Sequence, residues 1–220
     1  MSSKENKISE KELQNLRKQY TKSSLSANNV NKDPFKQFEK WFGEVLKSGF
    51  YEPSAMTLAT ASKEGMPSAR AVLLKGFDEN GFMFYSNYKS RKGKDIEQNP
   101  FGCLLFYWDK LERQVRIEGK IEKATKEESE AYFNTRPYKS RLGAWASNQS
   151  SVIEDRSVIV KEFLKYMVKF RNHVPLPPVW GGYRLIPGSF EFWQGRPNRL
   201  HDRIRYTRQK KVWKIERLAP

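Results

Sequence analysis

The sequence is poor in the residues that build disulfides and metal centres. Cys103 is the single cysteine among 220 residues, and His173 and His201 are the only histidines. An intrachain disulfide is therefore excluded, and we expect no bound metal, because too few cysteine and histidine ligands are present. Cys103 lies in the apolar stretch FGCLLFYW, which favours a buried structural thiol.

Long hydrophobic runs are also missing. No stretch approaches the roughly 18 apolar residues of a membrane-spanning helix. The N-terminal MSSKENKISEKELQN has no apolar core of the kind that secretory signals carry. We therefore predict a soluble cytoplasmic protein without a membrane partner. A Walker A loop, a GxGxxG loop and internal repeats are absent as well, which disfavours a doubly wound nucleotide-binding fold.

Positive charge is abundant. The chain has 41 lysines and arginines against 25 acidic residues, a formal net charge of +16. Most lysines are scattered, but the segment from Arg196 to Arg217 holds nine basic residues against Asp202 and Glu216. This density favours a phosphate-rich partner. Taken alone, it leaves open whether the phosphate belongs to a nucleic acid or to a small molecule.

The hydrophobic pattern predicts an N-terminal arm over residues 1–32 and one domain over residues 33–220. The arm is expected to contain a short helix over residues 9–20. Asp33 and Pro34 are expected to start a helix that ends at Gly49, since Asp is a good N-cap and Pro suits the first helical position. Further helices are predicted over residues 90–100, 125–136 and 155–170, and strands over residues 55–62, 68–77, 81–87, 101–108, 113–124, 181–195 and 199–208.

Strands outnumber helices and mostly follow one another directly. This order predicts a mainly β (α+β) protein, in which an antiparallel sheet closes into a small barrel and helices cover its ends. Within it, the segment RLHDR is of special interest. If it is a strand, Arg199, His201 and Arg203 point to one face, and such a row of cations favours an anionic ligand. The alternative for His201 is a structural role, and for Trp193 before it a place in the core.

Three other groups of residues favour phosphate binding. Arg70 and Lys75 lie near the two ends of an apolar strand, where they either protect an edge or contact an anion. Arg91 and Lys92 follow the expected N-cap Ser90, where cations oppose the helix dipole unless a phosphate is shared; a solvated loop is the alternative. Tyr132 and Arg136 share a helix face, and Pro137 ends that helix so that Ser140 can turn back, which completes a phosphate clamp of a type that also arises by chance.

The sequence resembles the pyridoxine/pyridoxamine 5′-phosphate oxidase family. The resemblance rests on SARAVLLKGF, SNYKSRKGKDIEQNP, RQVRIEG, YFNTRP, SNQSSVI, WGGYRL, EFWQGRPNRLHDR and the terminal ERLAP, from about Asp33 to Pro220. It implies an FMN-binding split β-barrel that works as a homodimer, with the flavin at the subunit interface. It also implies that a hydride passes from C4′ of pyridoxamine or pyridoxine 5′-phosphate to flavin N5, and that dioxygen becomes hydrogen peroxide. Pyridoxal 5′-phosphate is then the product, with ammonia from the amine, in vitamin B6 metabolism.

The resemblance also implies the site residues. It assigns the flavin to Arg70, Ala71, Val72, Leu73, Leu74, Lys75, Tyr85, Ser86, Arg91, Lys92, Gln114, Gln149, Ser150, Trp193 and Arg203. It assigns the substrate to Lys75, Tyr132, Arg136, Ser140, Arg199, Leu200 and His201, with Arg17 and Tyr20 of the arm as a lid and with Arg199 and His201 in the catalytic role.

Two other functions are alternatives to that of an oxidase. A nucleic-acid-binding module would explain the basic C-terminal segment, but the sequence has no recognisable reading helix or RNP-like motif. A flavin reductase or flavin carrier would keep FMN on the same barrel. The trio Tyr132, Arg136 and Ser140, together with RLHDR, argues against that rival, because these residues are expected to hold a phosphorylated substrate.

Overall fold

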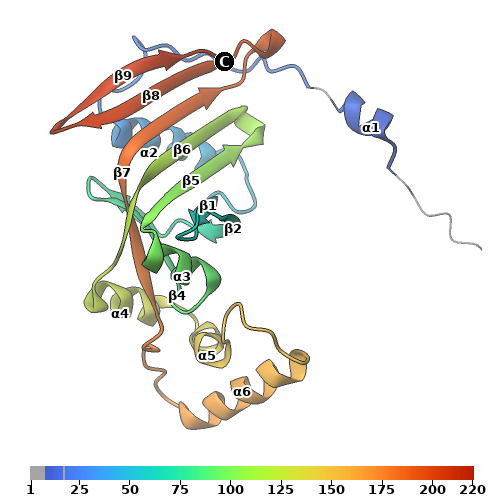
Figure 1. Ribbon diagram of the computed structural model, residues 1–220, viewed down its shortest axis with the longest axis vertical. Coiled ribbons are helices and arrows are strands. Elements are labelled where there is room, and N and C mark those ends of the chain that lie inside the picture. Colours follow the sequence, from blue (N-terminus) through green and yellow to red (C-terminus); the bar gives the residue numbers. More distant parts are fainter. Residues whose placement is uncertain (1–7, 17) are drawn as a thin grey trace, which may run out of the picture.

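A nine-stranded antiparallel sheet organises the protein. The computed structural model describes residues 8–16 and 18–220, and Figure 1 shows the sheet curling around a central helix. The strand order is β2-β1-β5-β6-β7-β4-β3, with β8 on β7 and β9 on β8. The strands are β1 (Ala55–Ala61), β2 (Pro67–Leu73), β3 (Gly76–Asp78), β4 (Gly81–Asn87), β5 (Phe101–Trp108), β6 (Arg113–Lys123), β7 (Trp180–Gln194), β8 (Asp202–Gln209) and β9 (Val212–Leu218).

The long strand β7 is where the sheet divides. Its first half pairs with β4, and its second half pairs with β8, while β6 follows it along most of its length. The change of partner occurs at a β-bulge, where the register between β6 and β7 shifts after Glu118. Gly119 is needed there, because a Cβ would lie 2.0 Å from the carbonyl oxygen of Ile186. The predicted antiparallel split barrel is thus confirmed, as a curled sheet in which no ladder among the described strands joins β2 to β3.

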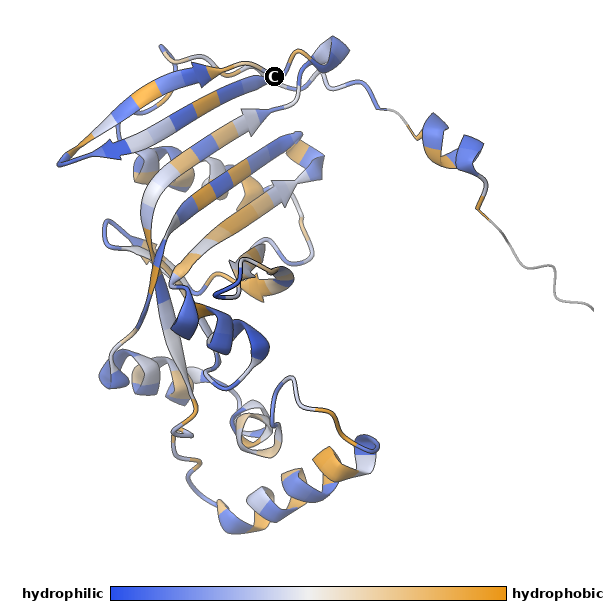
Figure 2. Ribbon diagram, viewed as in Figure 1, coloured by the Kyte–Doolittle hydropathy of each residue, from blue (hydrophilic) through white to orange (hydrophobic). Residues whose placement is uncertain are grey.

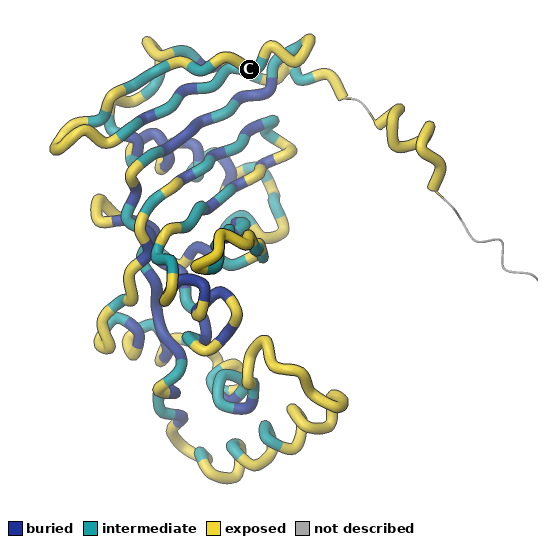
Figure 3. The backbone as a smooth tube through the Cα atoms, in the orientation of Figure 1, coloured by how far each residue is buried: buried dark blue, intermediate teal, exposed yellow. Residues whose placement is uncertain are grey.

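The described part of the chain has six α-helices, of which the first lies away from the sheet in Figure 1. They are α1 (Glu10–Asn15), α2 (Pro34–Leu46), α3 (Arg91–Gln98), α4 (Lys126–Thr135), α5 (Tyr138–Ala146) and α6 (Arg156–Lys169). None of them is long and apolar enough to cross a membrane. Figure 2 shows the alternation of apolar and polar residues along β6 and β8, and Figure 3 shows that the inner surface of the sheet is buried whereas α6 is largely exposed.

Helix α2 packs its apolar face into the curled sheet. The carboxylate of Asp33 accepts a hydrogen bond from the backbone N–H of Phe35 at 2.9 Å, which confirms the predicted cap. Phe38 is fully buried, and its ring lies 4.9 Å from that of Phe82 and 5.1 Å from that of Phe106. Burial of rings of this size supplies most of the stabilisation of such a core. A second, smaller cluster joins α4, α5 and α6 around Phe133 and Trp180.

One helix was not predicted, and two sequence predictions of local structure are wrong. Pro137 does not merely end α4: it is also the N-cap of α5, a helix that was not predicted. Residues 199–201 do not form a strand, since Pro197–Arg199 is a 3-10 turn and β8 begins at Asp202. The reason is that Asn198 and Arg199 have positive φ angles, 56° and 61°, which an extended strand excludes. The helix expected within residues 9–20 is limited to α1.

The segment that follows α1 is tied to the barrel by side-chain hydrogen bonds. The carboxylate of Glu112 accepts from the backbone N–H groups of Thr21 and Lys22 at 2.9 and 3.0 Å. The carboxylate of Asp202 accepts from the N–H of Leu25 at 3.0 Å, and the hydroxyl of Tyr206 donates to the carbonyl of Asn31 at 2.7 Å. The contacts of the predicted arm with the domain therefore begin well before residue 33.

Candidate functional site

A cavity of about 660 Å³ lies between the β2–β4 side of the sheet and helices α4 and α5. We call it the Arg136 cavity. Strands β2 and β4, the start of α3, the end of α4, one face of α5 and the start of β7 all contribute to it. Its lining is Arg70, Ala71, Val72, Leu73, Lys75, Tyr85, Ser86, Asn87, Lys92, Tyr132, Arg136, Ser140, Gly143, Ala144, Ser147, Gln149 and Trp180. Twelve of the residues that the sequence predicted for the site are thus brought together.

Arg136 is the cation at the helical side of this cavity. Arg136 is the C-cap of α4. Its guanidinium carbon lies 4.7 Å from the centroid of the Trp180 ring and 5.6 Å from that of the Phe133 ring. Its Nη1 atom is buried and has no hydrogen-bond partner in the structure. Burial lowers the pKa of Arg136, against the opposing effect of Tyr132. A buried N–H donor without an acceptor is costly, which indicates a position prepared for an external anion.

Aromatic rings form the wall beside Arg136. The rings of Tyr85 and Tyr132 stack with centroids 3.9 Å apart, and Trp180 stacks on Tyr85 at 5.6 Å. Burial raises the pKa of both tyrosines, so their hydroxyls remain protonated donors at neutral pH. The wall is therefore apolar and flat, with phenolic hydroxyls at its edge, as a bound planar ring requires.

Of the residues on the face of α5 that lines the cavity, the sequence predicted only Ser140. Ser140, Gly143, Ala144 and Ser147 all line the cavity at intervals of three and four residues, so they share one face of the helix. This spacing of small residues was visible in the sequence, but it had no meaning without a helix at this place. Asn87 and Trp180 were also missed; they are cross-strand partners one step beyond the predicted Tyr85 and Ser86.

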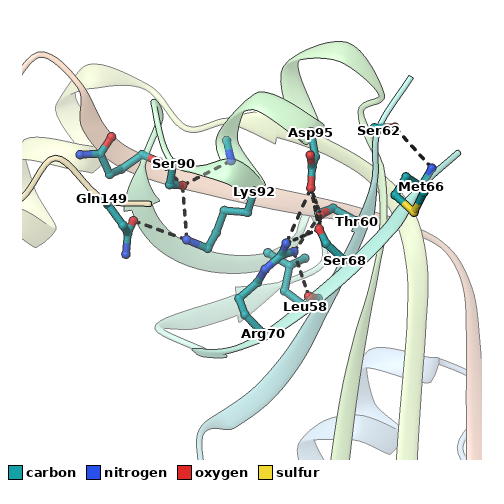
Figure 4. Close-up of polar contacts among 12 residues, drawn as sticks. Leu58, Thr60, Ser62, Met66, Ser68, Arg70, Ser90, Lys92, Asp95 and Gln149 are labelled. Atoms are coloured by element: carbon teal, nitrogen blue, oxygen red, sulfur yellow. Dashed lines mark hydrogen bonds and ion pairs between the residues drawn. The ribbon is translucent and has the colours of Figure 1, made fainter. Parts of the chain in front are cut away.

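Arg70 and Lys92 are the cations on the sheet side, as Figure 4 shows. The ammonium of Lys92 is within 3.3 Å of the Ser90 hydroxyl and 3.4 Å of the Gln149 side-chain oxygen, and no carboxylate of the described chain pairs with it. Burial lowers the pKa of Lys92, and the charge of Arg70 lowers it further. Ser90 caps α3 as predicted, because its hydroxyl accepts from the N–H of Gly93.

A second cavity, of about 500 Å³, lies at the far end of β7, and we call it the His201 cavity. The rings of Trp193 and His201 are 4.6 Å apart, and the ring of Tyr20 meets both at 5.7 Å. Nδ1 of His201 accepts from the backbone N–H of Arg196 at 3.2 Å, which places the proton of the neutral ring on Nε2. Burial, followed by the charge of Arg199, lowers the pKa of His201.

Three predicted residues form a row across adjacent strands next to this cavity. Gln114 on β6 is the cross-strand partner of Trp193 on β7, which in turn is the partner of Arg203 on β8. Side chains that are directly opposite in antiparallel strands lie on the same face of the sheet. Arg203 is not free in this row, because its Nε donates to Glu191 at 2.9 Å and its Nη1 to the carbonyl of Ala219 at 2.8 Å.

The two cavities are too far apart to serve one small ligand within a single chain. Trp180 lines the Arg136 cavity and Trp193 lines the His201 cavity, 13 positions further along β7. At about 3.3 Å per residue they are up to about 43 Å apart, and Figure 1 shows β7 running from α4 and α5 to the opposite end of the molecule. The expectation that Arg199, His201 and Arg203 meet the remaining site residues is therefore not met within one chain.

The other predicted residues lie outside both cavities. Leu74 is buried in the core, Arg91 is exposed at the start of α3, and Ser150 is exposed in the turn after Gln149 with a φ of 72°. Leu200 is exposed beside His201. Arg17 lies outside the described residues. The described part of the chain has no group of three or more side chains that could hold a metal ion.

Comparisons with known proteins agree on one family. The model of a family described as pyridoxamine 5′-phosphate oxidase matches residues 42–168, and that of the pyridoxine 5′-phosphate oxidase C-terminal dimerisation region matches residues 180–220. The chain is 55% identical over 211 residues to the pyridoxine/pyridoxamine 5′-phosphate oxidase of Burkholderia thailandensis, covering 94% of this chain and 99% of that protein. The enzyme of the same name from Burkholderia mallei is equally similar.

Solved structures show the same fold. PhzG from Burkholderia lata, in complex with tetrahydrophenazine-1-carboxylic acid, superimposes with a TM-score of 0.84 and 28% identity over 90% of this chain and 98% of that one. A pyridoxamine 5′-phosphate oxidase-related, FMN-binding protein from Nostoc punctiforme gives a TM-score of 0.68 at 18% identity, over 86% of this chain and 98% of that one.

Proposed function

Because the chain belongs to the pyridoxamine 5′-phosphate oxidase family, we propose that it oxidises pyridoxamine and pyridoxine 5′-phosphate at C4′ to pyridoxal 5′-phosphate. Membership makes it an FMN-dependent oxidoreductase of vitamin B6 metabolism. The finer assignments, namely the reaction at C4′, the roles of individual residues and the shared site, are the content of the proposal.

The Arg136 cavity has the features that a phosphorylated flavin and a phosphorylated substrate require. Arg136 has a buried donor without a partner, and Lys92 is a buried cation without a carboxylate. Both are unfavourable unless an anion completes them. The aromatic rings of Tyr85, Tyr132 and Trp180 line the same cavity. This pair of uncompensated cations in one aromatic-walled cavity is the observation that carries the proposal.

Residues are assigned to the two ligands by their position in the cavity. Arg70, Lys92, Ser86 and Gln149, on the β2–α3 side, would hold FMN and its phosphate. Tyr132, Arg136 and Ser140, on the helical side, would hold the phosphate of the substrate, with Lys75 near both. Arg136 contributes a fixed guanidinium, since Trp180 and Phe133 already hold its plane.

The composite site requires a second copy of the chain. Because the His201 cavity is at the far end of β7, its residues would reach the Arg136 cavity only from a partner subunit. The match of residues 180–220 to the family's dimerisation region supports this arrangement, since these residues include all of β7 and β8. The row of Gln114, Trp193 and Arg203 would then complete the flavin site across the interface.

The chemistry that bound FMN supplies is acceptance of the hydride from C4′ and transfer of its electrons to dioxygen, which gives hydrogen peroxide. The protein positions C4′ and excludes water. His201 has its ring proton on Nε2 and a lowered pKa, so it is neutral at pH 7 and can hydrogen-bond to the substrate or hold its proton. Arg199, exposed at the mouth of the same cavity, would orient the substrate ring.

Anaerobic mixing tests this proposal. Purified protein should be yellow, and pyridoxamine 5′-phosphate should bleach the flavin absorbance without oxygen, whereas pyridoxamine without its phosphate should do so only at much higher concentration. A flavin carrier or a reductase that uses another donor would retain its colour. Colourless protein that does not bind FMN would contradict the proposal altogether.

A further inference from the structure

A buried carboxylate stands behind the sheet-side cations of the Arg136 cavity. Asp95 on α3 is buried, and its Oδ2 atom accepts hydrogen bonds from the hydroxyls of Thr60 and Ser68, both at 2.7 Å (Figure 4). Thr60 lies on β1 and Ser68 opposite it on β2. Asp95 does not line the cavity, so it acts through the residues in front of it.

The same two hydroxyls connect Asp95 to Arg70. Nη1 of Arg70 donates to the Thr60 hydroxyl at 2.8 Å and to the carbonyl of Leu58 at 3.1 Å, and its Nη2 donates to the Ser68 hydroxyl. Nη2 also lies 3.6 Å from Oδ2 of Asp95. A guanidinium has five N–H donors. These bonds occupy three of them, so Nε–H and one Nη2–H remain for a ligand in the cavity.

The local charge is unbalanced without a ligand. Arg70 and Lys92 of the cavity lining, with the exposed Arg91 that starts α3 and acts on Asp95 from outside the cavity, contribute +3, and Asp95 contributes −1, which leaves +2 at this corner. Burial pushes the pKa of Asp95 upward, but the hydroxyl bonds and the charges of Arg70 and Arg91 outweigh it and lower the pKa. Asp95 is therefore ionised at neutral pH. A phosphate monoester carries about −1.5 to −2 at this pH, so a charge of +2 matches it.

We propose that Asp95 is the resident counter-ion of the flavin-phosphate corner. It partly neutralises Arg70 and Arg91 when no phosphate is bound, and it holds the guanidinium of Arg70 through Thr60 and Ser68 with two donors left for the phosphate. This inference rests on the assignment of FMN to the Arg136 cavity in the proposed function. It makes Asp95 a positioning residue that never touches the ligand.

The substitution Asp95→Asn should change the stability of the flavin-free protein and its affinity for FMN in opposite directions. In the wild type, the hydroxyls of Thr60 and Ser68 donate to the same oxygen atom of Asp95. The single side-chain oxygen of the asparagine in Asp95→Asn can therefore still accept both hydrogen bonds. Only the charge is lost. The flavin-free protein then carries three cations without an anion and should be less stable, and FMN should bind more tightly, since its phosphate no longer meets a negative charge behind Arg70. A residue that merely supports the fold would weaken FMN binding instead.

The test compares FMN with riboflavin, which lacks the phosphate. Flavin is stripped from the full-length wild type, from Asp95→Asn and from Glu97→Gln, an exposed carboxylate on the same helix that makes the matched control. The affinity ratio of FMN to riboflavin, measured by flavin fluorescence, should rise about three- to tenfold in Asp95→Asn, within the range of couplings between groups of one hydrogen-bond network. The ratio should change less than twofold in Glu97→Gln. Inorganic phosphate should raise the melting temperature of stripped Asp95→Asn more than that of stripped wild type.

The outcomes distinguish the counter-ion role of Asp95 from the proposed flavin site itself. An unchanged or lower ratio in Asp95→Asn, in a wild type that does prefer FMN, would overturn the counter-ion role and leave the flavin site intact. A wild type without any preference for FMN would instead contradict the proposed flavin site. If Asp95→Asn does not fold without FMN, the double variant Arg70→Gln/Asp95→Asn decides: it removes one cation with the anion and should recover folding, and failure to do so would refute the proposal.

Discussion

A substitution of Arg136 should weaken substrate binding strongly while it lowers the free energy of unfolding only little. Replacing it with methionine keeps an unbranched apolar side chain against Trp180 and removes the charge. The flavin-free protein loses a cation–π contact of about 0.5–2 kcal/mol, since the guanidinium carbon lies 4.7 Å from the ring centroid. It also loses the penalty of the unpartnered buried Nη1, about 1–3 kcal/mol. These terms oppose each other, so the free energy of unfolding should lie between about 1 kcal/mol below and about 2.5 kcal/mol above that of the wild type.

Substrate binding should respond very differently. A charged hydrogen bond to the substrate phosphate is worth about 1.5–3 kcal/mol, so KM for pyridoxamine 5′-phosphate should rise by roughly ten- to a hundredfold in Arg136→Met. Urea unfolding of the stripped protein and steady-state kinetics of the holoenzyme measure the two effects. Lys139→Met, which removes an exposed cation nearby on α5, is the matched control and should change neither. A loss of more than about 3 kcal/mol in stability, or a KM within threefold of wild type, would refute the reasoning.

Three further predictions follow from the described contacts. Gly195→Ala would put a Cβ 2.7 Å from the Tyr20 ring and displace it, so trypsin should cut the N-terminal arm faster and KM should rise; unchanged cleavage would contradict the packing of Tyr20. Phe38→Ala should lower the free energy of unfolding by about 3–5 kcal/mol in urea titrations, because its fully buried ring contacts several others; a loss below 1 kcal/mol would speak against this core. The pKa of His201 is lowered by burial and by Arg199, so its contribution to stability is complete above the ordinary pKa of about 6.5 and is lost as the pH falls through its folded value. Between pH 7.5 and 5 the urea midpoint of wild type should fall more than that of His201→Gln, and equal slopes would exclude the effect.

The sequence predicts the sheet and α2 well because their signals are local. Asp33 and Pro34 start α2, the alternation along β6 and β8 identifies strands of a half-buried sheet, and β5 is recognised as a continuous apolar run. Helix α5 was missed because a proline ends one helix and begins the next, and a single residue with two roles gives an ambiguous signal. The strand expected at residues 199–201 is absent because Arg199 has a left-handed conformation together with Asn198; asparagine favours that conformation, but arginine does not, so residue type gives a signal at only one of the two positions.

The site shows the same limit. Pattern and resemblance together named most of the residues in the Arg136 cavity, but neither could show that Trp193, Arg199 and His201 lie at the other end of β7. Such separation depends on the length and path of one strand. Asp95 was missed because it acts behind Arg70, through hydroxyls on two strands that the fold brings together.

The central claim is that each site combines the Arg136 cavity of one subunit with the His201 cavity of its partner, and subunit mixing tests it most directly. Arg136→Ala and Arg199→Ala, each inactive alone, are unfolded together in equal amounts and refolded with FMN. Random pairing gives mixed dimers in which one of two sites has both residues intact, so activity should return to about a quarter of the wild-type value. If the mixture stays as inactive as the separate variants, both residues serve the same chain and the account is wrong.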